Sequence, residues 1–122
     1  MDLEIVSVEN KGEIDSERLV LKAKADYVYT WDYAVLDNTY DKEDDVSNKN
    51  RHVFYFYDEE KYLTLEKDEV VYLYTKTGKY KCKDISGVAH HYFYWNLGKS
   101  IWNKDGDKIT LIEVKGNESK YV

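Results

Sequence analysis

The chain of 122 residues contains no proline and a single cysteine, Cys82. The absence of proline excludes collagen-like and proline-rich chains. One cysteine cannot form a disulfide within the chain, which excludes the small disulfide-bonded scaffolds of secreted proteins. Arginine is scarce as well, since only Arg18 and Arg51 occur among the 18 basic residues. Because arginine is the side chain best suited to reading base edges, sequence-specific DNA binding is disfavoured.

Long apolar runs are also missing. No segment approaches the roughly 18 apolar residues that a membrane-spanning helix requires, and residues 1–13 lack the basic start and apolar run of a signal peptide. The lone cysteine and the missing leader predict a reducing, cytoplasmic location. A formal net charge of -6 opposes general binding to nucleic acid, because phosphate repels an acidic protein. We therefore expect neither a membrane nor nucleic acid as the main partner.

Short runs of β-branched and aromatic residues alternate along the chain with segments of Gly, Asn, Asp and Lys. No window of helical length carries an apolar stripe at 3.6-residue spacing. The length fits one domain, which we place at residues 1–122. Residues 58–66 are compatible with a helical turn or with a short strand around 62–65. The pattern predicts an all-β sandwich of about seven antiparallel strands, at Leu3–Val8, Arg18–Ala25, Trp31–Asp37, His52–Tyr57, Glu69–Thr75, His91–Trp95 and Lys108–Val114.

Three of these runs sort their side chains by residue type, with tyrosines alternating with Phe, Trp, Val or Leu. Successive side chains along a strand point to opposite faces of the sheet, so the sorting assigns faces. One set is predicted to face the core: Phe54, Phe56, Val71, Leu73, Phe93 and Trp95. The other set is predicted to line the outer face of one sheet: Tyr55, Tyr57, Tyr72, Tyr74, Tyr92 and Tyr94.

This tyrosine-rich face is the main candidate for function. A phenol offers a flat apolar ring and a hydrogen-bonding hydroxyl, and tyrosine is enriched at protein interfaces for that reason. We expect the face to bind a protein partner or a second copy of the chain. The alternative is that cross-strand packing of tyrosines only stabilises the sheet.

Several segments resemble the lamin tail domain, an immunoglobulin-like sandwich. The resemblance begins at residues 5–8 and 17–21, and continues through the tryptophan-led strand Trp31–Asp37 and the segments 52–54 and 65–73. Its most specific part runs from Ile101 to Ile112, where a Trp is followed by a Gly-Asp turn and an apolar strand. The chain departs from the family at Thr30, where members usually have Gly, and at residues 67–68, where they often have Pro-Gly. Residues 80–88 have no counterpart.

The resemblance implies an immunoglobulin-like fold and a function in binding or scaffolding. In bacteria such domains are often attached to nucleases or to other secreted or surface hydrolases, and the family has no catalytic residues of its own. We therefore expect a non-enzymatic module that needs no cofactor.

Cys82 lies among lysines at positions 79, 81 and 83, whose charge would make a thiol more reactive. A cysteine hydrolase also needs a histidine base. His90 and His91 are adjacent, so on a strand they point to opposite faces and at most one could serve. Parity places His90 on the tyrosine face, and His91 and His52 on the core side. No CxxC or HxxxH spacing is present, so we expect an incidental cysteine, hydrogen-bonded histidines and no metal.

Acidic residues gather twice, and neither group has the alternating spacing with glycine of an EF-hand loop. Residues 105–107 (Asp-Gly-Asp) fit a turn. We expect solvated loops, with weak cation binding as the alternative. The first group is Asp37, Asp41, Glu43, Asp44 and Asp45, and the second is Asp58, Glu59, Glu60, Glu66, Asp68 and Glu69.

The only basic stretch contains Lys76, Lys79, Lys81 and Lys83, with Tyr80 among them and Tyr74 just before them. A basic aromatic hairpin would suit single-stranded nucleic acid or an acidic partner. The alternative is a solvated edge strand whose lysines prevent aggregation. The sequence thus favours a binding module that uses the tyrosine face, and the alternative function is an accessory module for a cation, a carbohydrate or single-stranded nucleic acid.

Overall fold

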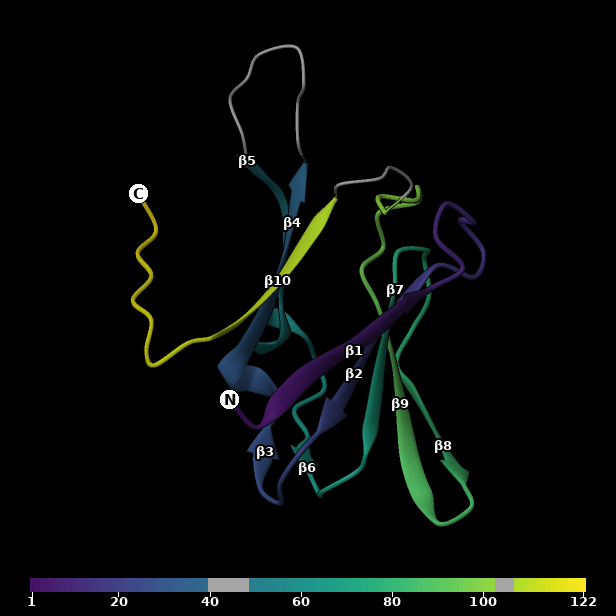
Figure 1. Ribbon diagram of the computed structural model, residues 1–122. Coiled ribbons are helices and arrows are strands. Elements are labelled where there is room, and N and C mark those ends of the chain that lie inside the picture. Colours follow the sequence, from purple (N-terminus) through teal and green to yellow (C-terminus); the bar gives the residue numbers. More distant parts are fainter. Residues whose placement is uncertain (40–48, 103–106) are drawn as a thin grey trace.

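The computed structural model describes residues 1–39, 49–102 and 107–122 (Figure 1). In this part of the chain the regular structure is strand, apart from two short 3-10 turns, η1 (Thr30–Asp32) and η2 (Phe56–Asp58). The prediction of an all-β protein is confirmed. The strands are β1 (Leu3–Glu9), β2 (Arg18–Ala23), β3 (Val28–Tyr29), β4 (Tyr33–Thr39), β5 (Lys49–Tyr55), β6 (Thr64–Leu65), β7 (Val70–Tyr74), β8 (Lys81–Ile85), β9 (Val88–Tyr94) and β10 (Lys108–Glu113).

Two sheets and a short ribbon make up the described structure. Five strands form the larger sheet in the order β1-β2-β7-β9-β8, three form a second sheet in the order β10-β4-β5, and β3 pairs with β6. Figure 1 shows β1 beside the three-stranded sheet and β8 at the margin farthest from it. The region 58–66, left open by the sequence, contains the end of η2 and the short strand β6.

The pairing departs from the prediction in one respect, because β7 and β9 run parallel, from Val70 opposite His90 to Tyr74 opposite Tyr94. Every other pair is antiparallel among the strands that the structure describes. After β7 the chain forms β8 at the sheet edge and returns as β9 between them. The sequence prediction missed β8 because all five of its residues are exposed, so it carries no alternation of buried and exposed positions.

The basic hairpin predicted around Lys79 is also corrected, since β7 and β8 are not paired with each other. The hairpin joins β8 to β9 through Ser86 and Gly87, which have positive φ values of 54° and 82°. A two-residue loop with positive φ at both positions has the twist that suits a β-hairpin. The Asp84 carboxylate accepts a hydrogen bond from the Gly87 backbone N–H at 2.9 Å and supports this turn.

The predicted core positions are confirmed at five of six sites, since Phe54, Phe56, Val71, Leu73 and Phe93 are each 5% exposed or less. The sixth, Trp95, is half-buried and packs against the same cluster. The rings of Phe56 and Phe93 meet edge to face with centroids 5.1 Å apart, which joins the β5–η2 segment to the larger sheet. Alternation along single strands was sufficient to find these residues.

A carboxylate is fully buried beside this core. The Glu17 side chain is 0% exposed. Its Oε1 accepts hydrogen bonds from the backbone N–H groups of Gly12 at 2.9 Å and Trp102 at 3.1 Å. Its Oε2 accepts from Thr75 Oγ1 at 2.9 Å and from the Ile101 N–H at 3.0 Å. Glu17 therefore ties three segments that are distant in sequence, a role that the sequence did not indicate.

Candidate functional site

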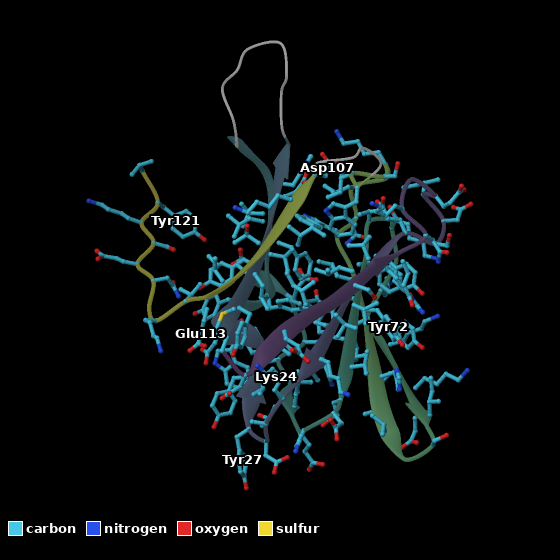
Figure 2. The ribbon with its side chains drawn as sticks, viewed as in Figure 1. Lys24, Tyr27, Tyr72, Asp107, Glu113 and Tyr121 are labelled. Atoms are coloured by element: carbon cyan, nitrogen blue, oxygen red, sulfur yellow. The ribbon has the colours of Figure 1, made fainter. Side chains whose placement is uncertain are left out.

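Four of the six predicted tyrosines stack on one another across β7 and β9. The ring centroids are 4.9 Å apart for Tyr72 and Tyr92, 6.3 Å for Tyr92 and Tyr74, and 5.3 Å for Tyr74 and Tyr94. His90 continues the stack, 5.7 Å from Tyr72. We call these five residues the tyrosine ladder. It lies on the outer face of the five-stranded sheet, and Figure 2 shows Tyr72 on the side away from β4 and β10.

Tyr55 and Tyr57 are not part of the ladder, contrary to the prediction of one six-tyrosine face. Tyr55 ends β5 in the three-stranded sheet and Tyr57 lies in η2. Their rings are 5.6 Å apart, and Tyr57 continues to Tyr62 at 6.0 Å and then to Trp31 at 5.8 Å. The prediction was wrong because alternation assigns a side chain to a face without showing which strands share a sheet.

Basic side chains lie on the rings of the ladder. The Arg18 guanidinium carbon is 3.9 Å from the centroid of Tyr72. The ammonium of Lys76 is 4.8 Å from the centroid of Tyr74. A ring attracts a cation over its face with about 0.5–1 kcal/mol at an exposed site. Lys81 makes the same contact with Tyr92 at 5.3 Å, so the basic stretch and the tyrosine face, which the sequence presented as separate features, meet on one surface.

The charge of this surface differs from that of the whole chain. Arg18 is neutralised by Glu9 and Lys22 by Asp68. Within the described ranges, no ion pair involves any of the four predicted lysines, Lys76, Lys79, Lys81 and Lys83. A protein of net charge -6 thus carries a locally basic face beside its tyrosine ladder.

The ring faces of the ladder are stacked on neighbours. Tyr94 is buried at 8% exposure, and the other four residues are half-buried. At its end, Gly78 lies directly on the Tyr94 ring, where a Cβ would stand 2.5 Å from the nearest ring carbon. Arg18 Nη1 donates to the Tyr74 hydroxyl at 2.9 Å. The hydroxyls of Tyr92 and Tyr94 have no hydrogen-bond partner among the described residues. The Tyr92 hydroxyl, on a half-buried side chain, is therefore available to an incoming group.

Two members of the ladder, Tyr72 and His90, have shifted pKa values. Burial raises the pKa of the Tyr72 hydroxyl, which therefore stays protonated. Burial, together with the nearby charges of His91 and Arg18, lowers the pKa of His90. A neutral imidazole can accept a hydrogen bond, and His90 Nδ1 lies 3.1 Å from the Tyr72 hydroxyl. The positive charge of the face consequently comes from its lysines, because Arg18 is paired with Glu9.

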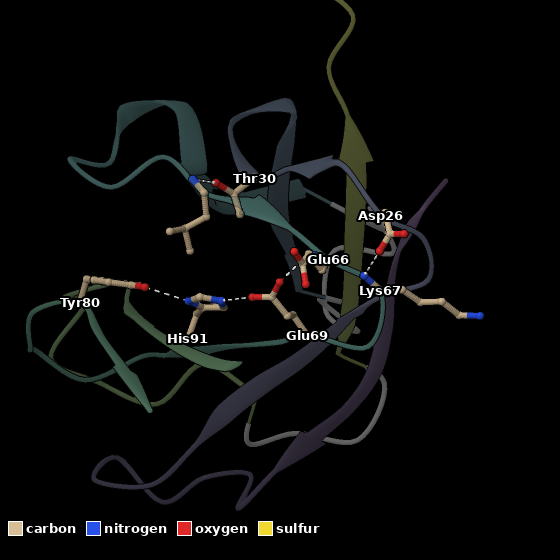
Figure 3. Close-up of polar contacts among 8 residues, drawn as sticks. Asp26, Thr30, Glu66, Lys67, Glu69, Tyr80 and His91 are labelled. Carbon is tan, nitrogen blue, oxygen red and sulfur yellow. Dashed lines mark hydrogen bonds and ion pairs between the residues drawn. The ribbon is translucent and has the colours of Figure 1, made fainter. Parts of the chain in front are cut away.

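A second cluster lies on the inner side of β9 (Figure 3). His91 Nδ1 is 2.8 Å from the Tyr80 hydroxyl and its Nε2 is 2.7 Å from Glu69 Oε1. Burial, followed by the neighbouring Cys82 sulfur, raises the pKa of Tyr80 to about 12, so the phenol keeps its proton near neutral pH. His91 Nε2 donates to the Glu69 carboxylate, which can only accept. Glu69, predicted to belong to a solvated loop, is instead part of this chain of hydrogen bonds.

Cys82 is exposed and lies opposite His91 in the pairing of β8 with β9. The sequence left open which of the two adjacent histidines could assist Cys82. The register of β8 against β9 places His91, and not His90, on the same face as Cys82. Both ring nitrogens of His91 are already bonded to Tyr80 and Glu69. His91 therefore has no free nitrogen to take a proton from the thiol. The other two histidines also have partners, Tyr72 for His90 and Asp37 for His52.

The structure places members of the two predicted acidic groups in different environments. Asp37 is 1% exposed within β4 and lies 3.2 Å from His52, so its assignment to a solvated loop is wrong. Residues 41–45 and 105–106 lie outside the described residues. The stretch 58–61 and the segment 78–80 line a pocket of about 790 Å³. There, burial and the charges of Asp58 and Glu60 raise the pKa of Glu59.

No set of three or more His, Cys, Asp or Glu side chains is placed to hold a metal ion within residues 1–39, 49–102 and 107–122. In the same ranges, no helix has the length and apolar character needed to cross a membrane.

Comparisons with protein-family models, curated proteins and solved structures give no match to this chain.

Proposed function

We propose that this protein is a non-enzymatic binding module that engages a protein partner through the outer face of its five-stranded sheet. The observation that carries the proposal is the convergence of the tyrosine ladder with lysines that have no acidic partner in the described structure. Tyrosine and cationic side chains on a flat sheet combine apolar area, hydrogen-bonding hydroxyls and charge, which are the properties of energetically important interface residues.

The proposal includes an immunoglobulin-like fold related to the lamin tail domain and a cytoplasmic location. Two sheets that share the core residues support the first part. The parallel pair β7–β9 and the added strand β8 are features that the resemblance did not anticipate. The exposed Cys82 thiol is compatible with a reducing compartment.

The ladder gives less support to the alternative ligands. Sugar rings and nucleic acid bases stack on open aromatic faces, whereas the faces of Tyr72, Tyr74 and Tyr92 are stacked on neighbouring rings. An acidic protein segment needs only the ring edges, the hydroxyls and the ammonium groups. A second copy of the chain is the other occupant that these groups would accept.

The double variant Tyr92→Phe/Tyr94→Phe tests this proposal, because it removes two hydroxyls without a partner and retains the stacked rings. Proteins captured from native extract by the immobilised chain are compared for the wild type, this variant and the control Tyr57→Phe in the other aromatic cluster. We expect the double variant alone to lose a captured protein. Light scattering at increasing concentration tests for a second copy in the same way. Identical captured proteins and identical mass for all three chains would contradict the proposal.

A further inference from the structure

Strand β8 offers a free edge beside the tyrosine ladder. It pairs with β9 on one side and with no described strand on the other. All five of its residues, Lys81–Ile85, are exposed. The unpaired main-chain N–H and C=O groups of such an edge can bond to another extended segment. In Figure 1 β8 lies at the margin of the sheet remote from β4, β5 and β10, so neighbouring strands leave room for an addition.

The side chains of β8 form two rows. Lys81 is opposite Tyr92 and Lys83 is opposite His90, which places both lysines on the face of the tyrosine ladder. Ile85 continues this row because side chains alternate with period two. The outer row therefore reads as two positive charges followed by one apolar residue, and Ile85 is 40% exposed.

The charges of this row determine which kind of strand could pair with β8. Directly opposite like charges destabilise a pair of strands, while opposite charges contribute roughly 0.2–1 kcal/mol for each pair. Neither Lys81 nor Lys83 has an ion-pair partner in the part of the chain that the structure describes. A second β8 in antiparallel register would bring lysines together, so self-pairing at this edge is opposed. An acidic strand would neutralise both charges.

The other free edge of the same sheet lacks these properties. β1 has a register shift between Ile5 and Ser7, and a bulge of this kind interrupts the line of edge groups. Its outer row contains Glu4 and Glu9, whereas that of β8 contains lysines.

We propose that β8 binds an extended acidic segment of a protein partner as a sixth strand of the sheet. Two acidic residues two positions apart would lie opposite Lys81 and Lys83, and an apolar residue would lie opposite Ile85. The inference rests on the proposed binding function and specifies the partner and the way it docks.

The probe is the synthetic peptide acetyl-Glu-Thr-Glu-Thr-Val-Thr-Glu-Thr-Glu-amide, which matches the row in either strand direction. It is titrated into the ¹⁵N-labelled chain and followed by amide chemical shifts. We expect saturable shifts in residues 81–85 and weaker binding at higher salt. The variant Lys81→Gln/Lys83→Gln should lower affinity by about two- to thirtyfold, while the control Lys99→Gln, an exposed lysine in another segment, should bind as the wild type does.

A second peptide separates strand addition from simple charge attraction. It has the same sequence with N-methyl groups on alternate residues, placed in two versions so that each row of N–H groups is blocked once. We expect one version to lose binding. If both versions bind as well as the parent, strand addition is wrong, although a face that attracts acidic segments, and hence the proposed function, is retained. If the parent peptide does not bind, or binds equally to the Lys81→Gln/Lys83→Gln chain, the acidic-strand proposal is overturned without bearing on the hydroxyl variants.

Discussion

Replacement of the buried Glu17 carboxylate tests how far one side chain holds the fold together. The variant Glu17→Gln keeps the size of the side chain and exchanges one oxygen for an amide NH₂. Each carboxylate oxygen accepts two hydrogen bonds, from Gly12 and Trp102 at one and from Thr75 and Ile101 at the other. An amide nitrogen cannot accept, so two donors lose their partner whichever way the amide is oriented. They are the buried Thr75 and Ile101 in one orientation. In the other they are the buried Trp102 and the exposed Gly12.

The expected loss of stability follows from these contacts. A buried polar group without a partner costs about 1–3 kcal/mol. One or two of the lost donors are buried, and the new amide N–H groups, which face donors, also lack an acceptor. Removal of a buried charge offsets part of this cost, and we expect a decrease of about 3 kcal/mol in the free energy of unfolding. Because small domains have only about 5–15 kcal/mol in total, such a loss would be large.

Urea unfolding followed by tryptophan fluorescence measures this loss. With a slope of about 2 kcal/mol per molar urea, the midpoint should fall by roughly 1.5 M. The control is Glu13→Gln, the same chemical change at an exposed position on the same loop; its effect should stay within about 0.5 kcal/mol. If Glu17→Gln loses less than about 1 kcal/mol, the four bonds do not contribute as the geometry indicates.

Two further predictions concern the margins of the ladder. In Gly78→Ala the new Cβ would stand 2.5 Å from the Tyr94 ring, so we expect a loss of about 1–3 kcal/mol on thermal unfolding. Gly116→Ala, where nothing lies within 4 Å, is the matched control and should change little. The pKa of Tyr80, raised from 10.0 to about 12, means that its protonated form stabilises the fold fully below pH 10 and loses this contribution as the pH rises through 12. Urea unfolding between pH 9 and pH 12 should therefore show a decline that is shallower in Tyr80→Phe, by about 1 kcal/mol after allowance for partial exposure, and equal slopes would refute the assignment.

Much of the candidate site follows from short-range sequence pattern. Phe93 and Tyr92 lie on opposite faces of the sheet because successive side chains along a strand point in opposite directions. This alternation does not depend on which strands are neighbours. The three histidines could likewise be placed on a face by parity. Strand β8 was not predicted, because an edge strand that is exposed at every residue has no alternation of apolar and polar side chains.

Sequence by itself thus determined the all-β class, the inward orientation of five core side chains and the outward orientation of the ladder tyrosines, because these depend on local backbone geometry. Only the tertiary structure decided which strands became neighbours. It paired β7 with β9 in parallel, which stacked Tyr72 on Tyr92 and excluded Tyr55. It also brought Lys81 onto the Tyr92 ring and gathered three distant donors around Glu17, from Thr75, Ile101 and Trp102. Contacts between residues far apart in the chain depend on how whole sheets pack, so they cannot be predicted from a local sequence pattern.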